Sequence, residues 1–387
     1  MRVGLVTGEY PPMEGGVGAY TRELARAMVG MGHDVHVFTR KGAHSPESSN
    51  DPGITVTGVV RSKWGWGTLG SIARWANENA LDIINLQFET AAFDMHPSIH
   101  WLGSRLTPHP LVVTFHDLRP PYLFPKAGFA RTMVMKKLAQ DASGVIATDR
   151  ADERELDSHC SLRMLTWIPI GSNVRDELPP DFDRSAWRAK IGVSAGDLLI
   201  SYFGFLNESK GGLVLVEALK CLVDAGTPAH LVMIGGRAGA SDPTNHAYAG
   251  RVDAMIAKTG LTERVTWTGF VDNTTLSCYF HSSELTALPY LDGVSLRRGT
   301  LMAALEHGMP IVTTETQTHA PELDGVVHTV AAGDPAALAD GIRLLWEDQR
   351  YRWALAESAR LASRHFHWDD IASRTVTFYQ NILDRRT

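Results

Sequence analysis

The chain has 387 residues and a formal net charge of −6, so nucleic-acid binding through a general basic excess is not expected. Hydrophobic residues make up 44% of the chain, which is enough for two packed cores and excludes a largely disordered protein. The three cysteines form no CxxC pair and the sequence has no HExxH motif, so neither a disulfide framework nor a metal site is expected.

The first half of the chain alternates strand and helix patterns. Helical spacing of apolar residues predicts helices at 18–29 and 69–79. Short apolar runs predict strands at 2–7, 34–39, 54–60, 82–86, 111–115, 144–147 and 165–170. Strands separated by helices indicate parallel pairing, with helices on both faces of one sheet.

The same pattern starts again after the proline-rich segment 169–180, which is therefore the expected domain boundary. Helices are predicted at 212–222 and 301–307, around 251–258, and from 336 onward. Strands are predicted at 198–203, 229–234, 265–268, 285–288 and 311–314. The sequence therefore indicates an α/β protein built from two doubly wound, Rossmann-like domains.

A glycine-rich loop that contains Gly15 and Gly16 joins the first strand to the first helix. Backbone N–H groups at a helix N-terminus can contact phosphate. The tight GxGxxG turn of a dinucleotide-binding domain does not fit, because two prolines lengthen the loop and Thr21 stands where the third glycine belongs. A loop that approaches a ligand is expected, and an ordinary glycine turn is the alternative.

His116 follows the strand 111–115, at the carboxyl edge where open α/β sheets bind ligands. A histidine there can exchange a hydrogen bond with a substrate hydroxyl, or it can serve the loop structurally. In the second half, Gly204 and Lys210 lie between a strand and a helix, where a lysine suits a diphosphate. A further loop that enters a helix holds Ser295, Arg297, Arg298, Gly299 and Thr300, and its paired arginines suit an anion.

Together these segments resemble the retaining glycosyltransferases of family four, whose GT-B fold has two Rossmann-like domains facing across a deep cleft. The resemblance covers nearly the whole chain. It rests on the PPxxGG loop at 11–16, the His116-Asp117 pair, GxLxxxKG at 204–211, VTWTGFV at 265–271, the GxP at 308–310 and the tail at 366–368. It implies that 1–172, with a C-terminal helix at about 366–387, binds the acceptor, and that 173–365 binds the nucleotide sugar.

The resemblance implies metal-independent transfer of a sugar from a UDP- or GDP-sugar to a hydroxyl of a glycan, a lipid-linked glycan or a small molecule. His116 would contact the donor sugar or orient the reacting centre. The donor site would comprise Gly15, Gly16, Gly204, Lys210, Phe270, Val271, Ser295, Arg297, Arg298, Gly299 and Thr300. In it, cations and N–H groups would bind the diphosphate, and the backbone at 270–271 would contact the base.

The sequence departs from the family at two places. The family's two glutamates, eight residues apart, fall at Ser295 and Ala303, with Glu306 as an outside candidate for the second. The arginine of the family's GRL is Phe205, and Arg297 and Arg298 would compensate for the lost charge. A sugar-nucleotide epimerase and a binding protein without turnover are the alternatives, and the absent glutamates argue against the epimerase.

The expected location is the cytoplasm. No window has the charged start and apolar core of a signal peptide, or about 18 consecutive apolar residues. The stretch 124–137 mixes basic and apolar residues in a way that suits peripheral contact with the inner membrane face. Lipid-linked acceptors are common in the family that the chain resembles. The oligomeric state is left open by these patterns.

Overall fold

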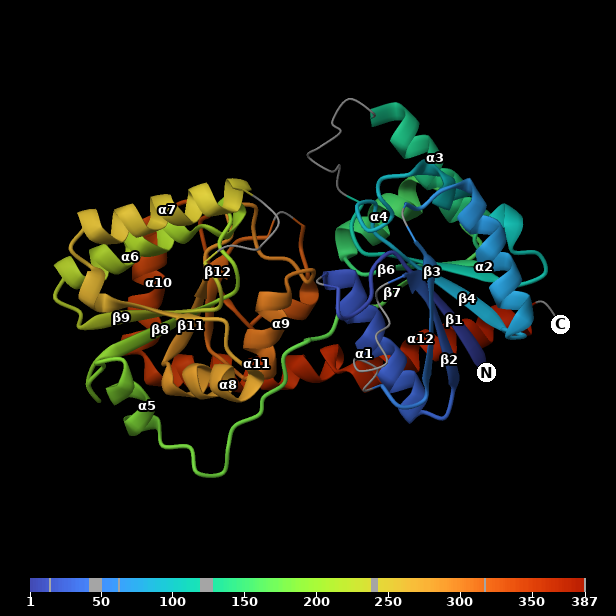
Figure 1. Cartoon of the computed structure of the whole chain (residues 1–387). Helices are drawn as coiled ribbons and strands as arrows, with labels where there is room; N and C mark the ends of the chain where they lie inside the picture. The colour runs from blue at the N-terminus through green and yellow to red at the C-terminus, as the bar shows by residue number, and fades with distance from the viewer. Residues whose placement is uncertain are drawn as a thin grey trace. The chain divides into compact units, whose positions relative to one another are not determined.

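The computed structural model describes residues 1–13, 15–41, 51–61, 63–118, 128–237, 243–316 and 318–385. The chain divides into two compact units. Unit 1 comprises Met1–Asn173 and Phe366–Thr387, and unit 2 comprises Val174–His365. Each unit is built around one parallel sheet with helices on its faces (Figure 1). This confirms the predicted pair of doubly wound α/β domains.

Unit 1 holds a seven-stranded sheet of order β3-β2-β1-β4-β5-β6-β7, and every neighbouring pair is parallel. Its strands are β1 (Arg2–Thr7), β2 (Asp34–Arg40), β3 (Ile54–Val60), β4 (Ile83–Phe88), β5 (Leu111–Phe115), β6 (Gly144–Ala147) and β7 (Leu165–Trp167). Its α-helices are α1 (Gly16–Gly30), α2 (Trp66–Glu78), α3 (Gly128–Asp141), α4 (Arg150–His159) and α12 (Trp368–Asp384).

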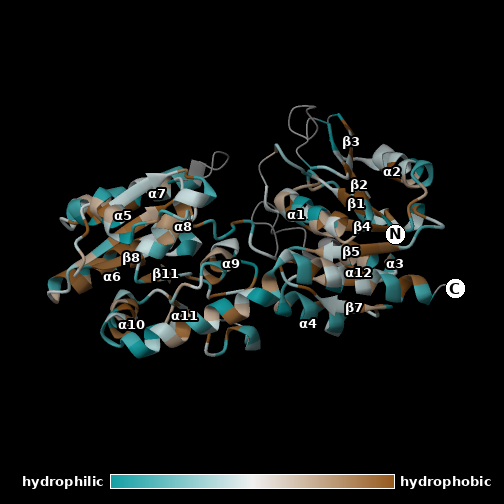
Figure 2. Ribbon diagram, turned by 90° about the horizontal axis from the view of Figure 1, so that it is seen from below, coloured by the Kyte–Doolittle hydropathy of each residue, from teal (hydrophilic) through white to brown (hydrophobic). Residues whose placement is uncertain are grey.

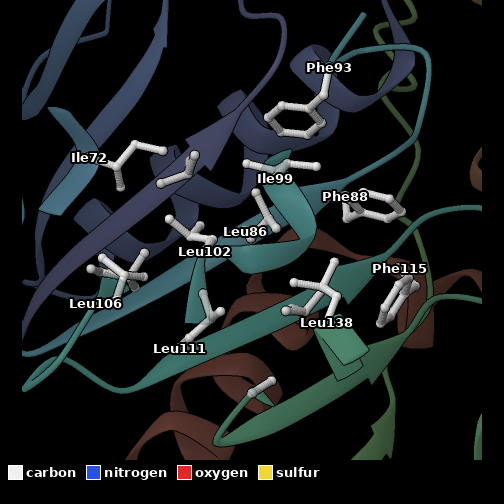
Figure 3. Packing of buried hydrophobic residues seen from close by; sticks show 14 of the residues in the cluster. Ile72, Leu86, Phe88, Phe93, Ile99, Leu102, Leu106, Leu111, Phe115 and Leu138 are labelled. Atoms are coloured by element: carbon white, nitrogen blue, oxygen red, sulfur yellow. The ribbon is translucent and has the colours of Figure 1, made fainter. Parts of the chain in front are cut away.

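Both faces of the sheet are buried at its central strands, which explains why β4 and β5 are nearly continuous apolar runs, whereas the edge strand β3 is partly exposed. Alternate residues of β1 belong to different clusters, with Leu5 on one face and Val6 on the other. Figure 2 shows hydrophobic strands flanked by helices with hydrophilic outer surfaces. Figure 3 shows the cluster on the Val6 side, where residues of β4 and β5 pack against the segment that holds Ile99 and Leu102.

The last helix of the chain, α12, completes the other face of this sheet and lies beside α1 (Figure 1). A buried polar chain joins it to two strands: Thr114 Oγ1 donates to Asn85 Oδ1 at 3.0 Å, and Asn85 Nδ2 donates to the hydroxyl of Tyr379 at 2.6 Å. At the start of α12, the indole of Trp368 donates to the carbonyl of Ser172 at 2.7 Å. These bonds fix a helix that is distant in sequence onto the first sheet.

Unit 2 holds a six-stranded parallel sheet of order β10-β9-β8-β11-β12-β13. Its strands are β8 (Leu198–Phe203), β9 (Ala229–Ile234), β10 (Val265–Gly269), β11 (Leu285–Leu288), β12 (Ile311–Thr314) and β13 (His328–Val330). Its α-helices are α5 (Arg184–Lys190), α6 (Gly212–Asp224), α7 (Pro243–Lys258), α8 (Asn273–Ser282), α9 (Gly299–Glu306), α10 (Pro335–Glu347) and α11 (Gln349–Ser363). The sequence patterns did not predict β13, because three residues are too few to show the apolar pattern of a strand.

Some element bounds differ from the sequence prediction for identifiable reasons. Helix α1 begins at Gly16 and not at residue 18, because the carboxylate of Glu9 accepts hydrogen bonds from the N–H groups of Val17 and Gly18. Strand β7 ends at Trp167 and not at residue 170, since Pro169 has no N–H to continue the ladder. Helix α9 begins at Gly299, two residues before the predicted start.

The stretch 124–137, predicted to contact a membrane, lies only partly within the described residues, because 119–127 are outside them. Within α3, Lys137 pairs with Asp141 one helical turn later, at 2.6 Å. No helix in the described ranges is both long enough and apolar enough to cross a bilayer.

The buried polar chain to α12 gives a stability prediction. Tyr379→Phe should lower the free energy of unfolding of unit 1 by about 1–3 kcal/mol, because it leaves the buried amide of Asn85 without its acceptor. Tyr10→Phe is the matched control, since the Tyr10 hydroxyl is buried without a partner among the described residues. That change should be neutral or stabilising. Hydrogen exchange of the β4 and β5 amides under native conditions measures both, and equal protection in the two variants would contradict the prediction.

Candidate functional site

The carboxyl ends of β8 and β11 bring three predicted residues of unit 2 together. Gly204 follows β8 and has a φ of +111°, which favours glycine. A Cβ at this position would lie 2.6 Å from Cγ2 of Thr300 and 3.1 Å from Nζ of Lys210. Gly204, Lys210 and Thr300 therefore meet at one point, where a side chain on residue 204 would displace one of the others.

The local chain geometry fixes Lys210 at this point. It ends the 3₁₀ helix Glu208–Lys210, whose N-cap residue is Asn207, and the Asn207 Oδ1 accepts from the Lys210 N–H at 3.1 Å. Gly211 follows with a φ of +68°, and a Cβ there would lie 1.9 Å from the carbonyl oxygen of Pro289. The KG pair in the sequence thus marks a turn that only glycine can complete.

The ammonium of Lys210 lies in an unusual electrostatic environment. Burial, and then the nearby guanidinium of Arg298, lower the pKa of Lys210 to about 8. No ion pair joins Lys210 to an acidic side chain in the described part of the chain, and no carboxylate contributes to its shift. Two cations repel each other strongly in a poorly hydrated site, and an anion that binds between them reduces this repulsion. The arrangement therefore suits a ligand with negative charge.

Arg298 is the N-cap residue of α9, and two contacts hold its side chain in place. Its guanidinium forms an ion pair with Asp292 and lies 4.6 Å from the ring centroid of Tyr290. The Tyr290 hydroxyl is 2.6 Å from Oγ1 of Thr300, which ties the first turn of α9 to the end of β11. Gly299 and Thr300 form that first turn, where helix N–H groups and the helix dipole favour an anion.

The remaining predicted residues of this loop differ in their surroundings. Arg297 and Ser295 are half-buried, and it is the charge of Arg298 and not that of Arg297 that acts on Lys210. Ala303, where the family has its second glutamate, is completely buried within α9. An alanine therefore fits the packing at that position, and the assignment of positions 295 and 303 to the missing glutamates stays a prediction.

An aromatic pair lies at the carboxyl edge of the same sheet. Phe205 follows β8 and Phe270 follows β10, and their ring centroids are 5.3 Å apart. Phe270 is 77% exposed, which is high for a large apolar side chain. A Cβ at Gly236, after the intervening strand β9, would lie 2.8 Å from the Phe270 ring, so a glycine lets the rings approach the backbone. Val271 follows and is half-buried.

In unit 1, His116 lies at the end of β5. Its Nε2 is 2.9 Å from Oε1 of Gln87, the residue that precedes the last residue of neighbouring β4. Its ring contacts Tyr20 of α1 edge to face, with centroids 4.6 Å apart. Burial lowers the pKa of His116 to about 3, so the imidazole is neutral at neutral pH. The sequence analysis missed Gln87, although a polar residue within the buried run of β4 was a usable signal.

The glycine loop of unit 1 contains a feature that the sequence did not predict. Glu9 Oε1 accepts hydrogen bonds from the N–H groups of Val17 and Gly18 at 3.1 and 3.2 Å, and burial raises the pKa of Glu9. A Cβ on Gly15 would lie 2.0 Å from the same oxygen. The side chain of Glu9 thus binds two of the donors at the start of α1. Contact of Gly15 and Gly16 with a diphosphate stays a prediction.

A search of the described residues for metal ligands finds no group of three or more histidine, cysteine, aspartate or glutamate side chains that could hold an ion. The assignment of the cations and aromatic rings of unit 2, and of the histidine of unit 1, to a binding site stays a prediction.

Comparisons with known proteins identify the family of the chain. Residues 15–159 match the family described as "Glycosyl transferase 4-like domain", and residues 197–348 match "Glycosyl transferases group 1". A D-inositol 3-phosphate glycosyltransferase of Xylanimonas cellulosilytica is 25% identical, covering 96% of this chain and 93% of the relative. A phosphatidyl-myo-inositol mannosyltransferase of Mycobacterium leprae is 24% identical, covering 99% of this chain and 97% of the relative.

Solved structures share the fold over nearly the whole length. A glycosyltransferase from Rickettsia africae superposes with a TM-score of 0.78 at 18% identity, covering 99% of this chain and 98% of its own. HepE of Anabaena, solved in complex with UDP, also gives a TM-score of 0.78, at 19% identity, covering 98% of this chain and 100% of its own. The two matched family domains together span more than half of the chain. The chain therefore belongs to the family-four glycosyltransferases and has their GT-B fold.

Proposed function

We propose that this glycosyltransferase uses a nucleotide-diphospho-sugar as donor and retains the configuration at the sugar's anomeric carbon. The observation that carries the proposal is the buried ammonium of Lys210 beside the guanidinium of Arg298, with a helix N-terminus completing the site. Asp292 neutralises part of this positive charge, and a diphosphate supplies further negative charge. The complex of HepE with UDP supports the choice of ligand by analogy of fold.

The chemistry of transfer requires charge stabilisation at the leaving diphosphate. As the bond from the anomeric carbon to the phosphate oxygen breaks, negative charge grows on the diphosphate, and Lys210 and Arg298 stabilise it. In the proposed mechanism the acceptor hydroxyl attacks the same face of the sugar and gives its proton to the leaving phosphate. This route needs no second carboxylate of the kind that retaining glycosidases use as a nucleophile.

The proposed roles of the other residues follow from their chemistry. Phe270 and Val271 contact the base, and the exposed rings of Phe205 and Phe270 suit a planar group. His116, being neutral, exchanges a hydrogen bond with a hydroxyl of the donor sugar and does not act as a cation. Unit 2 binds the donor and unit 1 the acceptor in this proposal.

The acceptor is a hydroxyl of a polyol, and the names of two relatives favour an inositol derivative. The direct test supplies UDP- and GDP-sugars with either inositol 3-phosphate or phosphatidylinositol in vesicles, and detects products by mass spectrometry. A product that needs the acceptor supports transfer, and the two arms separate a soluble acceptor from one in a membrane. Conversion of the donor without any acceptor would instead indicate an epimerase, and donor binding without a product would indicate a binding protein.

Removal of the Lys210 charge should weaken nucleotide binding. We expect Lys210→Ala to reduce the affinity for UDP or GDP by about 1.5–3 kcal/mol, the range for charge-assisted hydrogen bonds. Lys220→Ala is the control, because Lys220 lies on the adjoining helix α6 and pairs at the surface with Asp224. Isothermal titration calorimetry measures both variants. Unchanged affinity in Lys210→Ala would remove the donor-site assignment.

The same residue predicts a pH dependence of binding. Because the pKa of Lys210 in the free protein is about 8, its charge is lost as the pH rises from 7 to 9, and binding of a diphosphate must then take up a proton. The affinity should therefore fall above pH 8, by up to about tenfold per pH unit. Lys210→Arg stays charged throughout this range and should give a flat profile. Parallel profiles for both proteins would contradict this account.

The two arginines of the loop should differ. Arg298→Met removes the charge that acts on Lys210, so we expect weaker nucleotide binding, by about 1.5–3 kcal/mol, and a raised pKa of Lys210. Arg297→Met serves as the matched control and should change the affinity by less than about 0.5 kcal/mol. Calorimetry at two pH values measures affinity and proton uptake together. Equal losses in both variants would show that the loop acts through its total charge.

A further inference from the structure

The side chain of Gln87 is completely buried at the carboxyl end of β4, and its only hydrogen bond in the described residues is the one to His116. Its Oε1 lies 2.9 Å from Nε2 of His116. The two residues that pair with Gln87 in the sheet have other partners: Thr7 Oγ1 donates to the carbonyl of Glu9, and Thr114 Oγ1 donates to Asn85. The contact with His116 is therefore the specific interaction of this amide.

The chemistry of the contact determines which ring nitrogen carries hydrogen. An amide oxygen can only accept a hydrogen bond, so Nε2 of His116 must be the donor. In a neutral imidazole the other nitrogen, Nδ1, then keeps a lone pair and can only accept. A sugar hydroxyl that meets Nδ1 would donate to it.

We propose that Gln87 is a positioning residue that holds His116 as the Nε2–H tautomer and thereby makes Nδ1 an acceptor for a hydroxyl of the sugar. This inference rests on the proposed function of His116 and makes it more specific. In this proposal Nδ1 of His116 faces the sugar and accepts a hydrogen bond from its hydroxyl. Gln87 itself touches no substrate in this proposal.

A second observation argues that Gln87 is present for this role and not for stability. The Nε2 group of the Gln87 amide is buried and has no hydrogen-bond partner among the described residues. A buried donor without an acceptor destabilises a fold, and a methionine of similar volume would avoid that cost. Proteins keep a polar residue that lowers stability where function requires it, and Gln87 contacts a candidate site residue.

The experiment reads the tautomer directly in the ligand-free protein. With 15N-labelled histidine, long-range 1H–15N spectra distinguish Nε2–H from Nδ1–H, and the His116 signals are assigned by their loss in His116→Asn. Wild-type protein should show the Nε2–H form. Gln87→Met should lose this fixed tautomer while its melting temperature stays equal or rises. Gln87→Glu should restore the Nε2–H form, because the carboxylate also accepts, and should raise the pKa of the ring.

Kinetics supply the second readout. Gln87→Met should lower kcat about tenfold or more with little change in the donor KM, because the hydrogen bond to the sugar is altered after binding. Gln380→Met is the control, since Gln380 is exposed on α12. An Nδ1–H form in the wild type would overturn the proposal, since it would mean that the amide faces His116 with its nitrogen. An unchanged tautomer in Gln87→Met would also overturn it.

The two proposals can fail separately. If the spectra show the expected tautomers but no nucleotide sugar is turned over, the proposed function fails and the assignment of Gln87 stands. If transfer occurs while Gln87→Met keeps the tautomer and loses stability, the proposed function stands and Gln87 is a structural residue.

Discussion

The burial of the Lys210 ammonium beside a second cation is the constraint on which the arrangement of the donor site depends. In water these two groups would separate, yet the turn closed by Gly211 and the bare backbone of Gly204 hold the lysine against Thr300. Arg298 cannot move away, because Asp292 and the ring of Tyr290 fix its guanidinium. The repulsion between the two cations is therefore built into the fold, and it falls when an anion binds.

Burial leaves the candidate site residues of the two units in different charge states. In unit 2, burial leaves the ammonium of Lys210 charged at neutral pH, although its pKa is lowered. In unit 1, burial lowers the pKa of His116 to about 3, which keeps the imidazole neutral well below neutral pH. A positively charged group suits the part of a reaction where phosphate charge develops, whereas a neutral hydrogen-bonding group suits a hydroxyl. The same physical cause, removal from water, thus gives the two sites different chemistry.

The sequence predicted what depends on local spacing and missed what depends on the sheet order. The strands other than β13, and the glycine and lysine of the loop after β8, were predicted because each signal lies within a few residues along the chain. Asp292 as the partner of Arg298 was not predicted, although it lies only six residues away, because the bend of the loop determines that contact. Glu9 was not predicted because the capping of α1 becomes evident only in the folded structure. For Gln87 the polar residue in an apolar run is a sequence signal, but its contact with His116 depends on the pairing of β4 with β5.

The position of α12 has a consequence for how the protein is made. The first 173 residues leave the ribosome long before α12, which is separated from them by the whole of unit 2. Until then one face of the first sheet, with Val3, Ile83 and Val112, has α1 packed on it but lacks α12, which completes its cover. Nascent chains fold from the N-terminus as they emerge, so the first unit to be synthesised is the last to be completed. During that interval the growing chain carries an apolar surface that a chaperone could bind and that favours aggregation.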